Sequence, residues 1–157
     1  MTDRSRDRRA ALIGVLIVAV LGLGVNRLLL PGGTGEWYLS LVKPDLNPPS
    51  WLFGVVWPIL YILIGAAGGL IWKASFNRAR FWYILQLALN LLWSPVFFGM
   101  QRVDIGLGVI AALNIAAIIA TIRMAAVRRL AAWLMVPYLI WIAFAAILNL
   151  RIWQLNG

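Results

Sequence analysis

The chain has 157 residues, of which 63% are hydrophobic and only 12% are charged, and its mean hydropathy is +0.89. Soluble domains carry about 25% charged residues, so this composition excludes an ordinary soluble globule, a disordered chain and a collagen-like chain. The sequence contains no Cys and no His, which excludes disulfides, thiol nucleophiles and His-dependent catalytic triads, and we expect no metal site.

Five apolar stretches are long enough to cross a bilayer as helices. A hydrocarbon core about 30 Å thick needs about 20 helical residues, with a working range of about 17–25. The stretches are rich in Leu, Ala and Ile and lack the alternation of membrane-barrel strands. We therefore predict an all-α integral membrane protein, a five-transmembrane-helix bundle that forms a single domain over residues 1–157. The predicted spans are residues 10–30, 51–72, 81–101, 105–122 and 130–152.

Basic residues orient the predicted bundle. Four precede the first span, three lie between the second and third, and three between the fourth and fifth, which makes ten of the fourteen. The positive-inside rule then predicts a cytoplasmic N-terminus, and we expect a multi-pass protein of a bacterial cell membrane. The first stretch also resembles a signal peptide, but it ends in Asn26-Arg27-Leu28 without a small-x-small cleavage site, which favours an uncleaved span. The basic tail lacks interleaved aromatics, so we expect membrane lipids and no nucleic acid as partners.

Residues 31–50 form the only long predicted connection. Its middle is predicted to form a short helix with Trp37 and Leu41 on one side, and the prolines after it stiffen the return to the second span. We interpret this segment as a lid over the external mouth of the bundle, while an interfacial helix that only anchors the protein is the alternative. The predicted lid residues are Trp37, Tyr38, Lys43, Pro44, Pro48 and Pro49.

Three of the nine Trp residues lie inside predicted spans and do not fit the interfacial belt that accounts for the other six. Each belongs to a stripe of residues three or four apart, so that each stripe shares one helical face. Polar groups on these faces avoid lipid, where they would be unsatisfied. Converging stripes favour a pocket for a flat apolar ligand, although helix–helix adhesion is the alternative. The stripes are Trp57-Tyr61-Gly65-Gly68, Gln86-Asn90-Trp93-Phe97 and Tyr138-Trp141-Ala145-Asn149.

Two smaller features indicate helix contacts. The motif Gly65-x-x-x-Gly69 allows close approach of another helix, either within the bundle or between protomers. The isolated Asn114 of the fourth span is more typical of interhelical adhesion than of a ligand site.

Four spaced motifs resemble the translocator protein / tryptophan-rich sensory protein family (TspO/MBR). They occur in order from the predicted lid to the last span. The motifs are Trp37-Tyr38-x-x-Leu41-x-Lys43-Pro44-x-x-x-Pro48-Pro49, Val56-Trp57-x-x-Leu60-Tyr61, Leu89-Asn90-x-x-Trp93-Ser94-Pro95-x-Phe97-Phe98 and Pro137-Tyr138-x-x-Trp141-x-x-Phe144-Ala145-x-x-Leu148-Asn149.

The resemblance implies a five-helix bundle, usually dimeric, with a ligand cavity closed by the loop after the first helix. It implies binding of porphyrins, with protoporphyrin IX favoured over haem because the chain has no His or Cys ligand. It also implies light-dependent porphyrin degradation as an alternative, with Trp57 and Trp141 as candidate catalytic residues. Porphyrin would be a ligand, and no cofactor is required. The predicted ligand-binding residues are Trp57, Tyr61, Asn90, Trp93, Phe97, Tyr138, Trp141 and Asn149.

Two departures from the family pattern limit the resemblance. Leu46 stands where members usually carry an aromatic residue between Lys-Pro and Pro-Pro, and Leu150, Arg151 and Gln154 replace the proposed cholesterol motif of animal members. We therefore expect no specific sterol site at the C-terminus. A structural scaffold without a ligand is a further alternative. An ion-coupled transporter is disfavoured, because the predicted spans carry no charged residue away from their ends.

Overall fold

The computed structural model describes residues 3–29, 35–72 and 78–157, and within these ranges the chain forms helices and no β-strand. This agrees with the predicted all-helical architecture. The elements in chain order are α1 (Asp3–Leu29), α2 (Gly35–Ser40), α3 (Ser50–Ile71), α4 (Arg78–Ser94), the π-helical turn η1 (Pro95–Gly99), α5 (Val103–Val127) and α6 (Arg129–Asn156).

Among the described residues, four helical segments have the length and apolar composition to cross a membrane. These are Ser50–Ile71, Arg78–Gly99, Val103–Val127 and Arg129–Asn156. The predicted count of five spans is therefore not confirmed, because α1 is not among the four. The short helix α2 lies within the long connection, where the sequence predicted one. The helices also run past the predicted ends: α1 begins in the basic segment at Asp3, and α5 continues through Arg123 to Val127.

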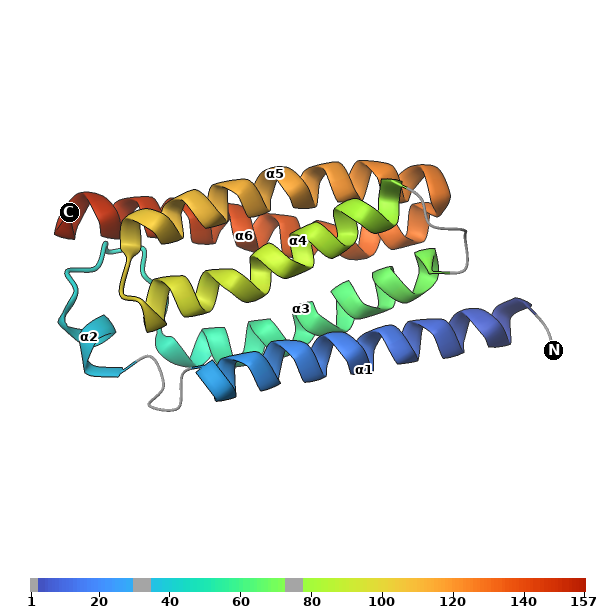
Figure 1. The fold of residues 1–157 in the computed structure, drawn as a ribbon, viewed down its shortest axis with the longest axis horizontal. Helices are drawn as coiled ribbons and strands as arrows, with labels where there is room; N and C mark the ends of the chain where they lie inside the picture. Colours follow the sequence, from blue (N-terminus) through green and yellow to red (C-terminus); the bar gives the residue numbers. More distant parts are fainter. Residues whose placement is uncertain (1–2, 30–34, 73–77) are drawn as a thin grey trace.

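The long helices lie side by side and the connections gather at the two ends (Figure 1). α1 packs on α3, α3 on α6, α6 on α5 and α5 on α4, while α4 makes only a light contact with α1. The N-terminus of α1, the end of α3, the start of α4 and the α5–α6 junction lie at one end, which we call the basic end. The helix α2, the turn η1 and the C-terminus lie at the other, the loop end.

Small residues bring α1 and α3 into backbone contact. A Cβ atom on Gly65 would lie 2.5 Å from the Cα atom of Val15, and one on Gly69 would overlap the carbonyl oxygen of Ala10. The motif Gly65-x-x-x-Gly69 is thus used within the bundle, which resolves the two interpretations that the sequence left open. At the basic end, an ion pair of 2.6 Å between Asp7 and Arg128 also joins α1 to the α5–α6 junction.

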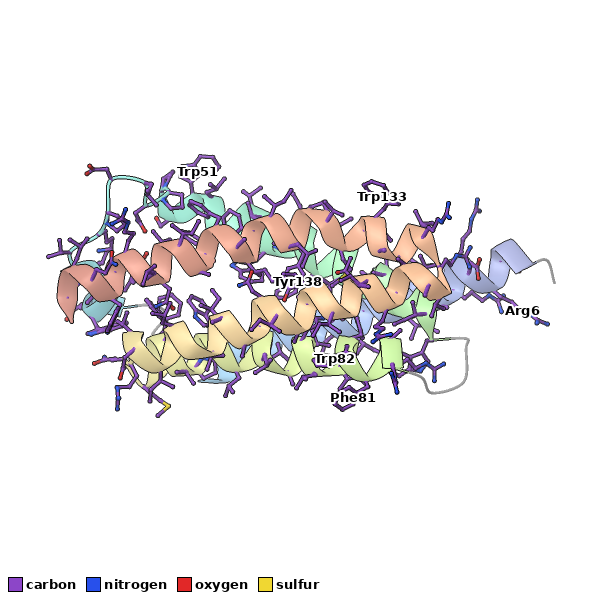
Figure 2. The ribbon with its side chains drawn as sticks, turned by 90° about the horizontal axis from the view of Figure 1, so that it is seen from above. Arg6, Trp51, Phe81, Trp82, Trp133 and Tyr138 are labelled. Carbon is purple, nitrogen blue, oxygen red and sulfur yellow. The ribbon has the colours of Figure 1, made fainter. Side chains whose placement is uncertain are left out.

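Among the described residues the buried polar side chains are Gln86, Asn90 and Asn149, and the last two have interhelical partners. The part-buried Asn114 also bonds across helices. The Nδ2 atom of Asn114 donates to the carbonyl oxygen of Ile142 in α6 at 3.1 Å, which is the adhesive contact expected for an isolated asparagine. In contrast, Trp51 and Trp133 project outward while Tyr138 lies between the helices (Figure 2). The exposed indoles fit the interfacial belt, and the buried aromatics belong to the interior.

Candidate functional site

A cavity of about 330 Å³ lies at the loop end, enclosed by α3, α4, η1, α6 and residues of the loop that carries α2. Its volume falls within the range of about 300–1,000 Å³ that is usual for small-molecule sites. Seven of the eight predicted ligand-binding residues line it. They are Trp57, Tyr61, Asn90, Trp93, Phe97, Trp141 and Asn149.

The eighth predicted residue, Tyr138, does not line the cavity. It is fully buried, and its hydroxyl oxygen accepts a hydrogen bond of 3.1 Å from the Nδ2 atom of Asn90. Tyr138 therefore orients the Asn90 amide through this hydrogen bond and does not itself contact the cavity. Helical periodicity placed it on the correct face, but one turn from Trp141 toward the basic end.

Aromatic rings form the walls of the cavity. The rings of Trp93 and Phe97 are stacked, with centroids 5.0 Å apart and planes inclined by 23°. The rings of Trp57 and Tyr61 lie 5.4 Å apart, and Trp141 meets Phe53 edge-on at 5.6 Å. Such walls offer flat apolar surfaces to a ligand and bury large areas when one binds.

Hydrogen bonds fix one of these walls. The Nε1 atom of Trp93 donates to the Oδ1 atom of Asn149 at 3.1 Å, and the Nδ2 atom of Asn149 donates to the carbonyl oxygen of Val103 at 3.0 Å. The chain of bonds joins α4, α6 and the start of α5. It orients the indole of Trp93, so Asn149 positions an aromatic wall as well as lining the cavity.

Two polar atoms of the cavity residues have no hydrogen-bond partner among the described residues. They are the acceptor Oδ1 of Asn90 and the donor Nε1 of Trp141, and both atoms are buried. An unpaired buried polar atom costs about 1–3 kcal/mol. A ligand that offers one donor and one acceptor would remove that cost, so these two atoms are suited to recognise polar groups on an otherwise apolar molecule.

The loop with α2 covers the cavity. Tyr38, Asn47 and Pro48 line it, and the Tyr38 hydroxyl donates to the Oδ1 atom of Asn47 at 3.0 Å. Burial raises the pKa of Tyr38, and the hydrogen bond to Asn47 opposes part of that shift. The ring of Trp37 meets Phe97 edge-on at 5.7 Å, so the loop packs directly on the turn η1.

The remaining predicted lid residues act on the loop itself and do not line the cavity. The Nζ atom of Lys43 donates to the carbonyl oxygens of Leu39 and Leu41 and lies 4.8 Å from the centre of the Tyr38 ring. The carbonyl oxygen of Pro44 accepts a hydrogen bond from the backbone N–H of Asn47 in a turn. Pro49 precedes α3 in an extended conformation. Residues 31–34 of the predicted lid lie outside the described residues.

Several residues that line the cavity or hold the loop over it escaped the sequence analysis. Phe53 precedes Trp57 by four residues, so the helical period that identified Trp57 could also have found it. Asn47 lies between the prolines of the loop, where no periodicity applies. Asn156, at the C-terminus, bonds both backbone groups of Val42 in the loop at 2.9 Å, and no local pattern connects residues 114 positions apart.

The described residues contain no group of three or more His, Cys, Asp or Glu side chains that could hold a metal ion.

The turn η1 begins at Pro95, which has no backbone N–H to continue the α-helical ladder. The turn brings Phe97 and Phe98 into edge-on contact at 4.8 Å beside Trp93, so the local proline shapes the aromatic wall.

Comparisons with known proteins agree with this architecture. A model of the TspO/MBR family matches residues 14–154. The chain is 41% identical over 145 residues to the tryptophan-rich protein TspO of Archaeoglobus fulgidus, covering 90% of this chain and 94% of that protein. It is 39% identical over 125 residues to the tryptophan-rich sensory protein of Cereibacter sphaeroides, covering 77% of each. It is 35% identical over 150 residues to the translocator protein of Homo sapiens, covering 92% of this chain and 89% of that protein.

Proposed function

The chain belongs to the TspO/MBR family, and on that premise we propose that it is a membrane receptor or sensor that binds porphyrins in the cavity at the loop end. Protoporphyrin IX is the favoured ligand. The observation that carries the proposal is the cavity itself, whose flat aromatic walls accompany one unpaired donor and one unpaired acceptor. Stacking on the walls would supply most of the affinity, and the polar atoms would orient the molecule.

The same proposal includes the placement of the protein in the membrane. α1 acts as the fifth span, because its apolar part packs along α3 through close glycine contacts. The N-terminus lies in the cytoplasm of a bacterium, since the basic end carries most of the positive charge. The protein forms a homodimer through a face other than Gly65 and Gly69, which α1 already covers.

Quenching of tryptophan fluorescence by protoporphyrin IX tests the binding proposal. The full chain in detergent should show saturable quenching, and a Trp57→Phe/Trp141→Phe variant should bind more weakly. A Trp51→Phe/Trp133→Phe variant is the matched control, because both of its indoles are exposed and outside the cavity. Non-saturable quenching, or equal weakening by both double variants, would contradict the assignment and favour a structural scaffold.

A second candidate function is light- and oxygen-dependent degradation of the bound porphyrin. It is supported by the presence of Trp57 and Trp141, both electron-rich indoles, in one cavity. In this reaction an indole would donate an electron to the photoexcited porphyrin, and dioxygen would be the oxidant. Under illumination in air, the porphyrin absorption should decay faster in the protein complex than in a solution of porphyrin and free tryptophan. An equal decay rate in the two samples would rule out the enzymatic function.

A further inference from the structure

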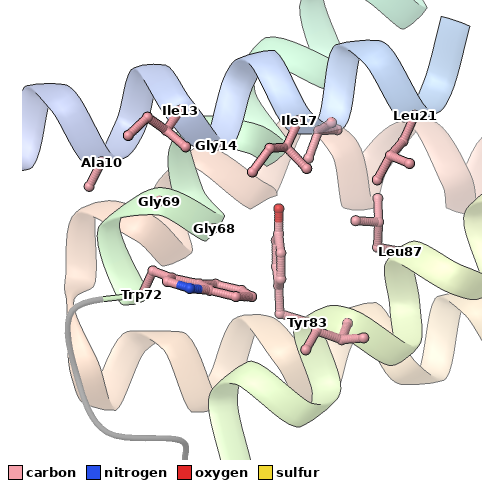
Figure 3. Close-up of a pocket in the computed structure, with 12 residues that line it drawn as sticks. Ala10, Ile13, Gly14, Ile17, Leu21, Gly68, Gly69, Trp72, Tyr83 and Leu87 are labelled. Atoms are coloured by element: carbon pink, nitrogen blue, oxygen red, sulfur yellow. The ribbon is translucent and has the colours of Figure 1, made fainter. Parts of the chain in front are cut away.

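A second concavity lies between α1, α3 and α4 on the side of the bundle where α1 and α4 barely touch. We call it the α1–α4 groove. Its volume is about 400 Å³ and its lining is almost entirely apolar. Figure 3 shows Trp72 and Ala10 toward one end, Leu21 and Leu87 toward the other, and the ring of Tyr83 between the helices. No residue lines both this groove and the cavity at the loop end.

The groove has the length of one leaflet. It extends along α1 from Ala10 to Leu21, which at about 1.5 Å per residue is about 16 Å. Half of a hydrocarbon core about 30 Å thick is about 15 Å. The groove therefore begins at the basic end and stops near the middle of the bilayer, as a slot for a single extended acyl chain would.

At the basic end of the groove, the helices α1 and α4 that form two of its walls each carry an arginine. Arg6 precedes Ala10 by one helical turn on α1, and Arg80 precedes Ile84 by one turn on α4, so each arginine shares a face with lining residues. The guanidinium carbon of Arg80 lies 5.1 Å from the centre of the Trp72 ring, which lines the groove. Arg6 is exposed and lies at the far end of α1 (Figure 2).

The surrounding charge is strongly positive. Among the described residues, the segments at this end contain nine basic residues and two acidic ones, Asp3 and Asp7. Asp7 is already paired with Arg128 at 2.6 Å. An anionic group at the mouth of the groove would therefore meet a positive field, and Arg6 and Arg80 are arginines that lie in line with the groove walls.

We propose that the α1–α4 groove binds an anionic phospholipid, with one acyl chain in the apolar slot and the phosphate group between Arg6 and Arg80. A second copy of the chain is the competing occupant of the groove, and the oligomeric state of the groove variants distinguishes it from a lipid. The proposal is independent of porphyrin binding.

Spin-labelled lipids in vesicles test the proposal. The full chain is reconstituted in phosphatidylcholine vesicles with trace phosphatidylglycerol or phosphatidylcholine carrying a label on the acyl chain. Electron spin resonance then gives the fraction of motionally restricted lipid. Phosphatidylglycerol should associate in preference to phosphatidylcholine. The preference should fall about fivefold for each arginine removed, which corresponds to about 1 kcal/mol each. The variant is Arg6→Gln/Arg80→Gln.

Two matched pairs of variants separate the groove from the general surface. Ile17→Trp fills the slot, whereas Leu16→Trp places the same ring on an exposed face of α1 outside it. Arg8→Gln/Arg129→Gln removes two exposed charges of the same end that neither adjoin nor line the groove. Only Ile17→Trp and Arg6→Gln/Arg80→Gln should reduce the preference for labelled phosphatidylglycerol over labelled phosphatidylcholine.

Three results would overturn the proposal. One is equal association of the two labelled lipids with the native chain. Another is an equal loss of selectivity in the control variants. A third is a change of oligomeric state in Ile17→Trp without a change in lipid association, since that would assign the groove to a second copy. Circular dichroism of each variant ensures that a loss does not come from unfolding.

Discussion

Asn156 joins the loop over the cavity to the end of α6, and its removal should speed ligand exchange. The Oδ1 atom of Asn156 accepts the N–H of Val42, and its Nδ2 atom donates to the carbonyl oxygen of Val42, both at 2.9 Å. A typical hydrogen bond contributes about 0.5–1.5 kcal/mol net. These two are exposed, so we expect Asn156→Ala to destabilise the closed loop by about 1–2 kcal/mol, which shifts the opening equilibrium by about 5- to 30-fold.

Stopped-flow fluorescence with protoporphyrin IX measures this effect. If the ligand enters and leaves through the loop, Asn156→Ala should raise both rate constants, while the dissociation constant changes less. Gln154→Ala is the control, because Gln154 is exposed on the same helix end and bonds only Arg151, at 3.2 Å. Unchanged rates in Asn156→Ala, or the same acceleration in both variants, would refute the reasoning that this loop gates the cavity.

Three other predictions concern packing, ionisation and the aromatic wall. Gly65→Val should lower stability by about 1–3 kcal/mol in a thermal melt, because its side chain would meet α1, whereas Gly54→Val points into open space and should have little effect. Burial raises the pKa of Tyr38, so loop closure should be fully stable below about pH 10 and weaken as the pH rises through the folded-state pKa. Porphyrin release should then accelerate in the native chain but not in Tyr38→Phe. Asn149→Leu should lower the melting temperature, since it leaves the Trp93 N–H without its partner at a cost of about 1–3 kcal/mol; an unchanged melt would contradict this.

Helical periodicity explains why much of the site could be predicted from the sequence. Residues three and four apart on one helix share a face, and a buried amide or indole must turn away from lipid. This reasoning selected Asn90, Trp93 and Trp141, all of which line the cavity. It could not show that Trp93 would bond Asn149, because that pairing depends on how far α4 and α6 are shifted along each other.

The position of a side chain along the bundle axis and the contacts between distant segments could not be predicted from the sequence, because both depend on how the helices pack. Tyr138 lies on the inward face of α6, yet packing places it behind the cavity with its hydroxyl on Asn90. The contact between Asn156 and Val42 joins residues 114 positions apart, which no helical period relates to each other. The helix ends also differed, because a helix such as α5 continues through Arg123, beyond the apolar stretch that predicted it.

The bundle uses two kinds of helix contact, and only one of them adjoins the cavity. Lipid supplies no hydrophobic driving force between helices, so association depends on close packing and hydrogen bonds. α1 is held on α3 by backbone contact at glycines, while α4 is held on α6 by the bonds of Asn90 and Trp93. The second set also builds the cavity wall, so these side chains serve folding and binding together. The Oδ1 atom of Asn90 and the Nε1 atom of Trp141 differ, because neither bonds another described residue. Their hydrogen-bonding capacity is not used among the described residues, and for this reason the proposed ligand is expected to carry one donor and one acceptor.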